Sequence, residues 1–595
     1  MKNLKRLLSY MRGQEMMYVL ALMFTLFSQV IVALQPKLIK ITIDSVIGKA
    51  ALANTFLENM VSIFKNYLNG YTGLFIMAGF ITAFAILRSC LTFARINLAS
   101  IATERSIKNL RDKLYNHIQL LPYSYHSKAK TGELIQRCTS DIETIRLVLY
   151  SQIMDTISSV FLIIYTVYLM SQANIKLMLV SFSVMPFVFL SSIVFFKVVK
   201  GRFKAATEKE AAMTTAIQEN LTGIRVVKAF TRQQYEIEKF KNRSEAYRNQ
   251  NLKLVCSFAS FWAVSDILSL GQIFAIIFYG STLAYHGEIS VGTLVAFITY
   301  VGMLLGPVRR LGRIISNIGK AFVSVNRIET ILQEEAEVIF PTNKKPEIKG
   351  GIVFDSVSFF YPGAEKTIVL DKVSFSIKAG QTVAILGPTG SGKSSLVHLI
   401  ARLYEYNSGS IKIDGIELNT IDKGWIRSKI GLILQEPFLY GKTIMENIKL
   451  AVPEKSDSAA KYYSKIASLD KEINRFTDGY STIVGERGVS LSGGQKQRLA
   501  IARTLIKESP VLIFDDSLSA VDTQTDAEIR EALASEKKDK TTIIISHRIS
   551  TVKDADMILV LENGKITAQG KHEDLIKHDG LYKRIYDIQN TDNAA

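Results

Sequence analysis

Gly387-Pro388-Thr389-Gly390-Ser391-Gly392-Lys393-Ser394 separates two segments with different hydrophobic patterns. The apolar run Thr382 to Leu386 before this stretch predicts a buried strand, and the apolar spacing from Leu396 to Leu403 after it predicts a helix. Glycines let successive backbone N–H groups curl around a polyphosphate at the positive end of a helix. In such a loop Lys393 reaches the β and γ phosphates, and Ser394 offers its hydroxyl to Mg²⁺. An ordinary Gly-rich turn needs neither flanking element, so the sequence predicts a phosphate-binding loop.

The first half of the chain carries long apolar runs. Met16 to Pro36 contains no charged residue, and as a helix it would span ~31 Å, which matches a bilayer core of ~30 Å. Comparable runs recur at about Gly73 to Leu87, Leu147 to Met170, Leu177 to Phe196, Leu254 to Leu283 and Val291 to Leu305. A soluble protein with buried helices does not require so many runs of this length, so six membrane spans are expected.

Asp155 and Asp266 are the charged residues inside these runs, and Arg88 interrupts the second run. An unpaired charge at mid-membrane costs ~2.5 to 3.5 kcal/mol, so Arg88 is expected to be paired or near a bilayer edge. Asp155 and Asp266 lie within apolar runs. Either they face a cavity that prefers cationic amphiphiles, or each pairs with Arg88 or caps a helix near the interface. The sequence leaves both interpretations open. It also does not decide whether a molecule bound there would be a drug, a lipid, a peptide or a sterol-like compound.

The net charge of +18 and the 48% apolar composition indicate a membrane protein with a large soluble part. Nucleic-acid binding is not expected, because the basic residues of the first half fall mostly between alternate spans, as in Arg105 to Arg146 and Lys197 to Lys253. This asymmetry places the N-terminus and the phosphate-binding loop in the cytoplasm of a multi-pass cell-membrane protein. The three cysteines are far apart in sequence and predict neither a disulfide framework nor a metal cluster.

The chain divides into three parts by composition. Residues 1–332 form the predicted all-α membrane domain, whose helices extend into the cytoplasm at Ala94 to Leu120 and Gly201 to Asn220. Residues 333–349 form a charged linker with two prolines, and residues 350–595 an α/β domain. Val511 to Asp515 within that domain predicts a buried parallel strand that ends in a Mg²⁺-binding carboxylate.

The second half resembles the nucleotide-binding domain of ATP-binding-cassette (ABC) transporters along nearly its whole length. The resemblance rests on a set of sequence motifs that occur in the same order as in the family. They are Phe359-Phe360-Tyr361-Pro362, the phosphate-binding loop, Gln435 after a strand, Leu491-Ser492-Gly493-Gly494-Gln495, Asp515, Ser519-Ala520-Val521-Asp522 and His547. The Leu491 to Gln495 pentapeptide is the family signature and the most specific of these motifs.

The resemblance implies a role for each motif. Adenine stacks on Tyr361, and the nucleotide contacts Gly387, Pro388, Thr389, Gly390, Ser391, Gly392, Lys393, Ser394 and Ser395. Mg²⁺ is held by Ser394, Gln435 and Asp515, and catalysis is assigned to Asp516, His547 and Gln435. The signature residues Leu491, Ser492, Gly493, Gly494 and Gln495 act on a partner's ATP, with Asp522 in the loop that crosses the interface. The implied cofactors are ATP and Mg²⁺.

The membrane half resembles bacterial multidrug or lipid exporters, in which six membrane helices are fused to one nucleotide-binding domain. Leu110 to Arg137 and Gln218 to Phe230 look like the two intracellular loops of that group. The resemblance implies short coupling helices near Pro122 to Ala129 and Thr207 to Met213. It also implies that Gly485-Glu486-Arg487-Gly488 reports the ATP state to them.

One position departs from the family pattern. Family members usually carry glutamate after the metal aspartate as general base, whereas this chain has Asp516. The shorter side chain withdraws the carboxylate by roughly 1.5 Å, about one C–C bond, and a misplacement of about 1 Å can cost ~10²-fold in rate. Hydrolysis at this chain's own site is therefore expected to be slow, while ATP binding is expected to survive.

The resemblance also implies that each ATP lies between one subunit's phosphate-binding loop and the other subunit's signature. With one copy of each, the chain is expected to act as the degenerate-site subunit of a heterodimer, with a homodimer as the alternative. The expected function is ATP-driven export of a hydrophobic or amphipathic substrate by alternating access. An ATP-gated or regulatory membrane subunit is the alternative; a soluble cassette ATPase is excluded by the membrane spans, and an importer usually keeps the two domains on separate chains.

Overall fold

The computed structural model describes residues 2–48, 56–64, 70–337, 344–364, 367–485, 488–517, 523–535 and 540–592. The chain forms two compact units. Unit 1 comprises Met1–Gln119 and Lys130–Glu334, and unit 2 comprises Leu120–Ala129 and Glu335–Ala595. The short segment between two long helices of unit 1 therefore belongs structurally to the α/β unit.

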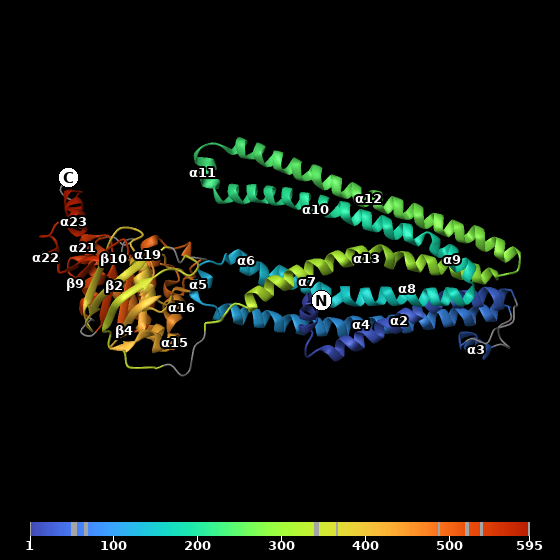
Figure 1. The fold of residues 1–595 in the computed structure, drawn as a ribbon, viewed down its shortest axis with the longest axis horizontal. Helices are drawn as coiled ribbons and strands as arrows, with labels where there is room; N and C mark the ends of the chain where they lie inside the picture. Colours follow the sequence, from blue (N-terminus) through green and yellow to red (C-terminus); the bar gives the residue numbers. More distant parts are fainter. Residues whose placement is uncertain are drawn as a thin grey trace. The chain divides into compact units, whose positions relative to one another are not determined.

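Unit 1 is helical throughout its described residues (Figure 1). Its helices are α1 (Lys2–Ser9), α2 (Glu15–Ile41), α3 (Phe56–Ser62), α4 (Gly70–Leu120), α6 (Thr131–Gln136), α7 (Ile142–Leu147), α8 (Ile153–Ala173), α9 (Ile175–Ser183), α10 (Met185–Thr222), α11 (Ile224–Ala229), α12 (Gln233–Tyr285) and α13 (Val291–Leu332). Wider π-helical turns continue α2 and join α6, α7 and α8 into one long rod.

Five of these helices or helical rods are long and apolar enough to cross a membrane: Glu15–Ile47, Tyr71–Leu120, Thr131–Ala173, Ile175–Thr222 and Gln233–Tyr285. The sixth predicted span is a shorter apolar stretch, Val291–Pro307, at the start of α13. Many large apolar side chains on these helices face outward, as Phe75 and Phe274 do. Outward-facing apolar residues of this number are typical of a surface that contacts lipid.

The fourth predicted span is divided between two helices. α9 ends at Ser183 and α10 begins at Met185, with Pro186 in the first turn of α10. Proline suits the start of a helix because its missing N–H group would have had no partner there. The core of this part of unit 1 joins α8, α9, α12 and α13 through buried residues that include Met170, Leu177, Ile276 and Phe297. α10 and α12 pack side by side along their length (Figure 1).

Unit 2 contains two sheets. The larger has the strand order β10-β9-β3-β8-β7-β6, and the smaller has the order β2-β1-β4-β5. The larger sheet consists of β3 (Thr382–Leu386), β6 (Ile430–Ile433), β7 (Val511–Asp515), β8 (Thr541–Ile545), β9 (Met557–Glu562) and β10 (Lys565–Gly570). All its pairings are parallel except that of β9 with β10. The smaller, antiparallel sheet consists of β1 (Ile352–Phe359), β2 (Leu370–Ile377), β4 (Ser408–Ile413) and β5 (Ile416–Glu417).

Unit 2 also contains a set of helices. They are α14 (Lys393–Ile400), α15 (Lys423–Lys429), α16 (Ile444–Ile448), α17 (Asp457–Ile466), α18 (Asp470–Ile473), α19 (Gly493–Leu505), α20 (Thr523–Ser535), α21 (Ile549–Val552), α22 (His572–Leu575) and α23 (Leu581–Asp592), with α5 (Tyr123–His126) added from the N-terminal half. Alternate residues of β7 enter different cores: Val511 and Ile513 pack with β1 and β2, whereas Leu512 and Phe514 pack with α19. A strand buried on both faces is the expected form of a central parallel strand. The predicted fold class, a helical membrane domain followed by an α/β domain, is confirmed.

Candidate functional site

The phosphate-binding loop connects β3 to α14, as predicted. Its glycines are required by the surroundings of the backbone. A Cβ atom at Gly387 would lie 2.1 Å from the carbonyl oxygen of Leu561, and one at Gly392 would lie 2.9 Å from that of Val369. Gly392, which caps α14, also has a φ of +103°, a conformation that favours glycine. The loop therefore presents its backbone N–H groups at a helix N-terminus, where anions bind.

Lys393 is the first residue of α14, and its side chain folds back over the loop. Its Nζ donates to the carbonyl oxygens of Gly387 and Pro388, each at 2.8 Å. Burial lowers the pKa of Lys393, while the nearby carboxylates of Asp516 and Asp515 act in the opposite direction. The ammonium group therefore donates to backbone carbonyl oxygens of the loop, and the oxygens of a bound polyphosphate can take over these hydrogen bonds or be added to them.

Ser394 and Asp515 form the candidate Mg²⁺ site. Ser394 Oγ donates to Asp515 Oδ1 at 3.0 Å. Burial raises the pKa of Asp515; the Ser394 hydrogen bond opposes this shift and the Asp516 carboxylate adds to it. Among the residues that the structure describes, no cluster of three or more His, Cys, Asp or Glu side chains is placed to hold a metal. One hydroxyl and one carboxylate still fit Mg²⁺, which usually takes one or two protein ligands with phosphate and water completing its shell.

The predicted catalytic residues lie at the same edge of the parallel sheet. Gln435 follows β6, Asp516 follows β7 and His547 follows β8, and the C-terminal ends of parallel strands meet at one edge, where ligands bind. Gln435 Nε2 lies 3.4 Å from Asp516 Oδ2. Burial lowers the pKa of His547, Lys393 lowers it further and Asp516 opposes the shift. The structure therefore brings Gln435, Asp516 and His547 together beside Lys393.

Asp516 has an unusual backbone conformation. Its φ is +47°, and its backbone N–H donates to the carbonyl oxygen of Ile545 at 3.0 Å. Aspartate and asparagine adopt this left-handed region more readily than other residues with side chains. The backbone aims the Asp516 carboxylate toward Gln435 and not away from the site.

Tyr361 lies in an aromatic cluster next to the phosphate-binding loop. Its ring makes edge contacts with Phe359 and Tyr404, at centroid distances of 4.9 and 5.1 Å. Its hydroxyl is 2.7 Å from Ser395 Oγ on α14. This placement suits the predicted adenine contact because it ties the ring to the helix that follows the phosphate loop.

Helix α5 adds residues that the sequence did not indicate. Tyr123 packs edge-on against Tyr404 and His398, at centroid distances of 5.5 and 5.8 Å. Ser127 Oγ accepts a hydrogen bond from Tyr404 at 3.1 Å, and Lys128 donates to the carbonyl oxygen of Pro362. The only sequence signal was the predicted coupling helix near Pro122 to Ala129, and it did not identify these contacts.

The signature residues begin α19. Ser492 caps this helix, and it forms reciprocal bonds with Gln495: Gln495 N–H donates to Ser492 Oγ at 3.3 Å, and Ser492 N–H donates to Gln495 Oε1 at 2.9 Å. Gly493 and Gly494 form the first turn, and Leu491 is buried in the core beside it. No hydrogen bond or ion pair among the described residues joins this pentapeptide to the phosphate-binding loop of the same chain.

Two predicted motifs cannot be placed. Asp522, with Ser519 to Val521, lies outside the described residues, as do Glu486 and Arg487 of the segment before the signature. The second predicted coupling helix is wrong in position. Residues 207–213 lie inside the continuous helix α10, and the short separate helix is α11, Ile224–Ala229. The break comes at Gly223, whose φ and ψ of −92° and 13° end α10.

Comparison with known proteins identifies the family. The family described as "ABC transporter transmembrane region" matches residues 18–308, and the one described as "ABC transporter" matches residues 370–519. The chain is 34% identical over 594 residues to "Uncharacterized ABC transporter ATP-binding protein YknU" of Bacillus subtilis (strain 168), which covers 100% of this chain and 98% of the relative. It is 35% identical over 562 residues to "Putative multidrug export ATP-binding/permease protein SAV1866" of Staphylococcus aureus (strain Mu50 / ATCC 700699), covering 93% and 94% of the two chains.

A solved structure shows the same fold. "Structure of a bacterial Atm1-family ABC exporter with ATP bound" superposes with a TM-score of 0.77 and 25% identity, and covers 97% of this chain and 98% of that one. The chain therefore belongs to the ABC transporter family. It is a multi-pass membrane protein of the half-transporter type, with its helical membrane domain and its ATP-binding domain fused in one chain.

Proposed function

We propose that this chain is one half of an ATP-driven exporter that moves a hydrophobic or amphipathic substrate out of the cytoplasm or the inner leaflet by alternating access. The observation that carries the proposal is the site at the edge of the parallel sheet, where Lys393, Ser394, Gln435 and Asp515 come together in a chain that also carries membrane-crossing helices. The Staphylococcus aureus relative that is named a putative multidrug export protein supports the direction of transport.

Different residues of this chain bind the nucleotide, hold the metal and act on the water at the ATP site. The loop from Gly387 to Ser395 binds the phosphates through backbone N–H groups and Lys393, and Tyr361 stacks on adenine. Ser394, Asp515 and Gln435 would hold Mg²⁺, which would supply positive charge to the phosphate oxygens. Gln435 and His547 position water and the γ phosphate, and Asp516 accepts the proton of the water slowly because its side chain is short.

A second subunit completes each site. The hydroxyl of Ser492 and the first N–H groups of α19 suit a γ phosphate, yet among the described residues they form no hydrogen bond with the chain's own phosphate-binding loop. We infer that they complete the ATP site of a partner half-transporter. Asp516 favours a heterodimer, in which this chain's own site holds ATP as a clamp and its signature serves a fully active partner site.

ATP is coupled to transport because it binds one conformation of the paired ATP-binding domains better than the other. Two ATP molecules that bridge two ATP-binding domains favour the closed pair, and hydrolysis removes the bridge. Helix α5 is the part of the membrane-side chain that joins the ATP-binding unit, where Tyr123 contacts the aromatic cluster around Tyr361. Closure is expected to reach the membrane helices through this segment.

The Tyr123→Ala variant tests that route. Each edge-to-face aromatic contact contributes ~0.5–1.5 kcal/mol beyond buried area, and the substitution removes the contacts with Tyr404 and His398. We expect substrate transport to fall by about tenfold, with ATP affinity changed less than about threefold. The matched control is Tyr235→Ala, at an exposed position of α12. An equal loss of ATP affinity and transport would instead place Tyr123 in the nucleotide pocket.

Inside-out vesicles test the function itself. The complex purified through this chain is reconstituted with a fluorescent amphiphile outside, and Mg²⁺ and ATP are added. We expect accumulation against the concentration gradient, and no accumulation when Lys393→Ala is combined with the same change at the equivalent phosphate-loop lysine of the second subunit. ATP-dependent movement that stops at equal concentrations would contradict an exporter and indicate an ATP-gated channel. The same purification shows one band for a homodimer and two for a heterodimer.

A further inference from the structure

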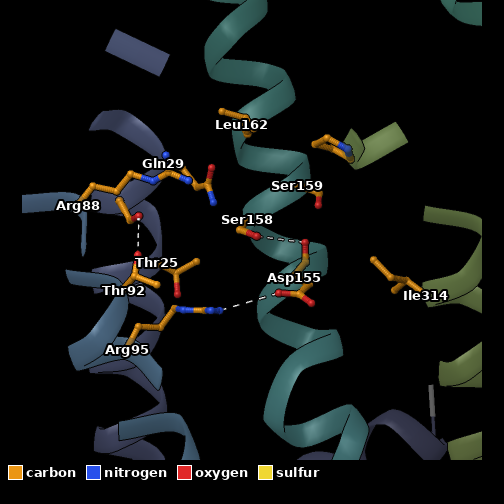
Figure 2. Close-up of a pocket in the computed structure, with 12 residues that line it drawn as sticks. Thr25, Gln29, Arg88, Thr92, Arg95, Asp155, Ser158, Ser159, Leu162 and Ile314 are labelled. Atoms are coloured by element: carbon orange, nitrogen blue, oxygen red, sulfur yellow. Dashed lines mark hydrogen bonds and ion pairs between the residues drawn. The ribbon is translucent and has the colours of Figure 1, made fainter. Parts of the chain in front are cut away.

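A polar cavity lies within the membrane helices of unit 1 (Figure 2). It has a volume of about 220 Å³ and is formed by α2, α4, α8 and α13. Its lining residues are Thr25, Ser28, Gln29, Arg88, Thr92, Arg95, Asp155, Ser158, Ser159, Leu162, Pro307 and Ile314. Charged residues inside a membrane domain are costly and usually mark a functional site.

The charges in this cavity do not cancel. Arg95 Nη1 lies 3.9 Å from Asp155 Oδ1, so the carboxylate is engaged by Arg95 and not by Arg88, the partner considered from the sequence. Asp266, on α12, is not among the described residues that line the cavity. Two arginines against one carboxylate leave an excess positive charge, opposite to the cavity for cations that Asp155 alone would predict.

Arg88 is the arginine available to a ligand. Figure 2 shows its side chain extended toward Gln29. In the part of the chain that the structure describes, the Arg88, Gln29 and Ser159 side chains donate no hydrogen bond to another protein group, whereas Ser28 and Thr92 are 3.4 Å apart. A guanidinium group with a neighbouring amide and hydroxyl matches the oxygens of a phosphate or carboxylate group.

The position of the cavity along the helices also matters. Thr25 lies ten residues from Glu15 at the start of α2, a rise of ~15 Å, about half of a bilayer core. With the N-terminus in the cytoplasm, Thr25 and the cavity that it lines lie near the bilayer centre. Leu162, Pro307 and Ile314 add an apolar wall beside the charges.

We propose that this cavity is the subsite for the anionic group of an amphipathic substrate, a phosphate monoester or a carboxylate attached to an apolar chain. The inference rests on the proposed export function and specifies its substrate class. Arg88 binds the anion, Arg95 adds charge while paired with Asp155, and the apolar chain of the substrate extends along Leu162 and Ile314.

Equilibrium binding of tritiated dodecyl phosphate to the complex in nanodiscs without ATP tests this assignment. We expect dodecanoate to compete, and dodecyltrimethylammonium and monolaurin not to compete. Inorganic phosphate is expected to need more than about 100-fold higher concentration, because it lacks the chain that the apolar wall holds. Equal competition by the cation would overturn the proposal, and equal competition by inorganic phosphate would show that the site takes a free anion and not an amphiphile.

Three variants separate a ligand role from a structural one. Arg88→Gln is expected to weaken dodecyl phosphate binding by at least about tenfold, as loss of a charge-assisted hydrogen bond does. Asp155→Asn is expected to strengthen binding by about threefold because it removes a competing carboxylate, whereas a purely structural Arg95–Asp155 pair predicts loss. Arg105→Gln, at an exposed position of α4, is the matched control and should change nothing.

The two proposals fail in different ways. Unchanged binding in Arg88→Gln, or weaker binding in Asp155→Asn, would overturn the subsite even if the vesicles show ATP-driven transport. Binding with the expected pattern in a complex that moves amphiphiles only to equal concentrations would keep the subsite and overturn the exporter.

Discussion

Asp516→Glu is expected to raise the steady-state ATP hydrolysis rate at this chain's own site by about 10²-fold. The added methylene advances the carboxylate by roughly one C–C bond, 1.5 Å, toward the place that we propose for the attacking water beside Gln435 and His547. Asp516 Oδ2 already lies 3.4 Å from Gln435 Nε2, so the longer side chain enters an assembled site. The measurement is phosphate release by the complex purified through this chain; in the proposed heterodimer, the partner residue equivalent to Asp516 is replaced by glutamine so that only this chain's site is followed.

Asp516→Asn is the control for this prediction. Because it keeps the size of the side chain and removes its basicity, it should give no gain in the hydrolysis rate at this chain's own site, which we expect to be slow already. A large loss in Asp516→Asn together with no gain in Asp516→Glu would show that aspartate already works as the base. Thermal unfolding of both variants checks that the backbone at φ +47° tolerates the change.

Lys393→Ala and Ser492→Ala are expected to affect different ATP sites. Removing the ammonium group of Lys393 should weaken ATP binding at this chain's own site by about 10- to 100-fold, since a hydrogen bond to a charged group contributes ~1.5–3 kcal/mol. Ser492→Ala should leave that affinity within about threefold and reduce turnover at the partner's site. Site-resolved binding of a fluorescent ATP analogue, together with phosphate release, measures both effects.

Ser492 also caps α19, and losing an N-cap costs ~0.5–2 kcal/mol of stability. Ser456→Ala is the matched control, because Ser456 caps α17 through the same bond to the third helical N–H group. Its stability loss should resemble that of Ser492→Ala without the loss of turnover. Comparable loss of affinity at this chain's own site in Lys393→Ala and Ser492→Ala would contradict the arrangement in which the signature serves the partner.

Local patterns predicted much of the ATP-binding unit. The phosphate-binding loop is fixed by glycines, a strand and a helix that are adjacent in sequence, and buried strands such as Val511 to Asp515 show as continuous apolar runs. That Gln435, Asp515 and His547 come together follows from the rule that parallel strands share a C-terminal edge. The distances between these side chains could not be predicted from the sequence, because they depend on packing between the strands and on the left-handed backbone at Asp516.

Contacts between helices that are distant in the chain could not be predicted from the sequence. Arg95, not Arg88, pairs with Asp155, because the register between α4 and α8 decides which arginine is opposite. Tyr123 contacts Tyr404 because α5, which lies in the N-terminal half of the sequence, belongs to the ATP-binding unit. The second coupling helix was placed one segment too early, since Thr207 to Met213 has the same helical pattern as its surroundings and the break falls at Gly223.

The central claim is that ATP draws two ATP-binding domains together and thereby changes the access of the membrane helices. Spin labels attached through Lys553→Cys, an exposed position of unit 2, and its equivalent in the partner measure the distance directly, after Cys90, Cys138 and Cys256 are replaced by serine. We predict a shorter distance on addition of Mg²⁺ and ATP, and no shortening when both phosphate-loop lysines are alanine. An identical distance distribution with and without ATP would contradict the account.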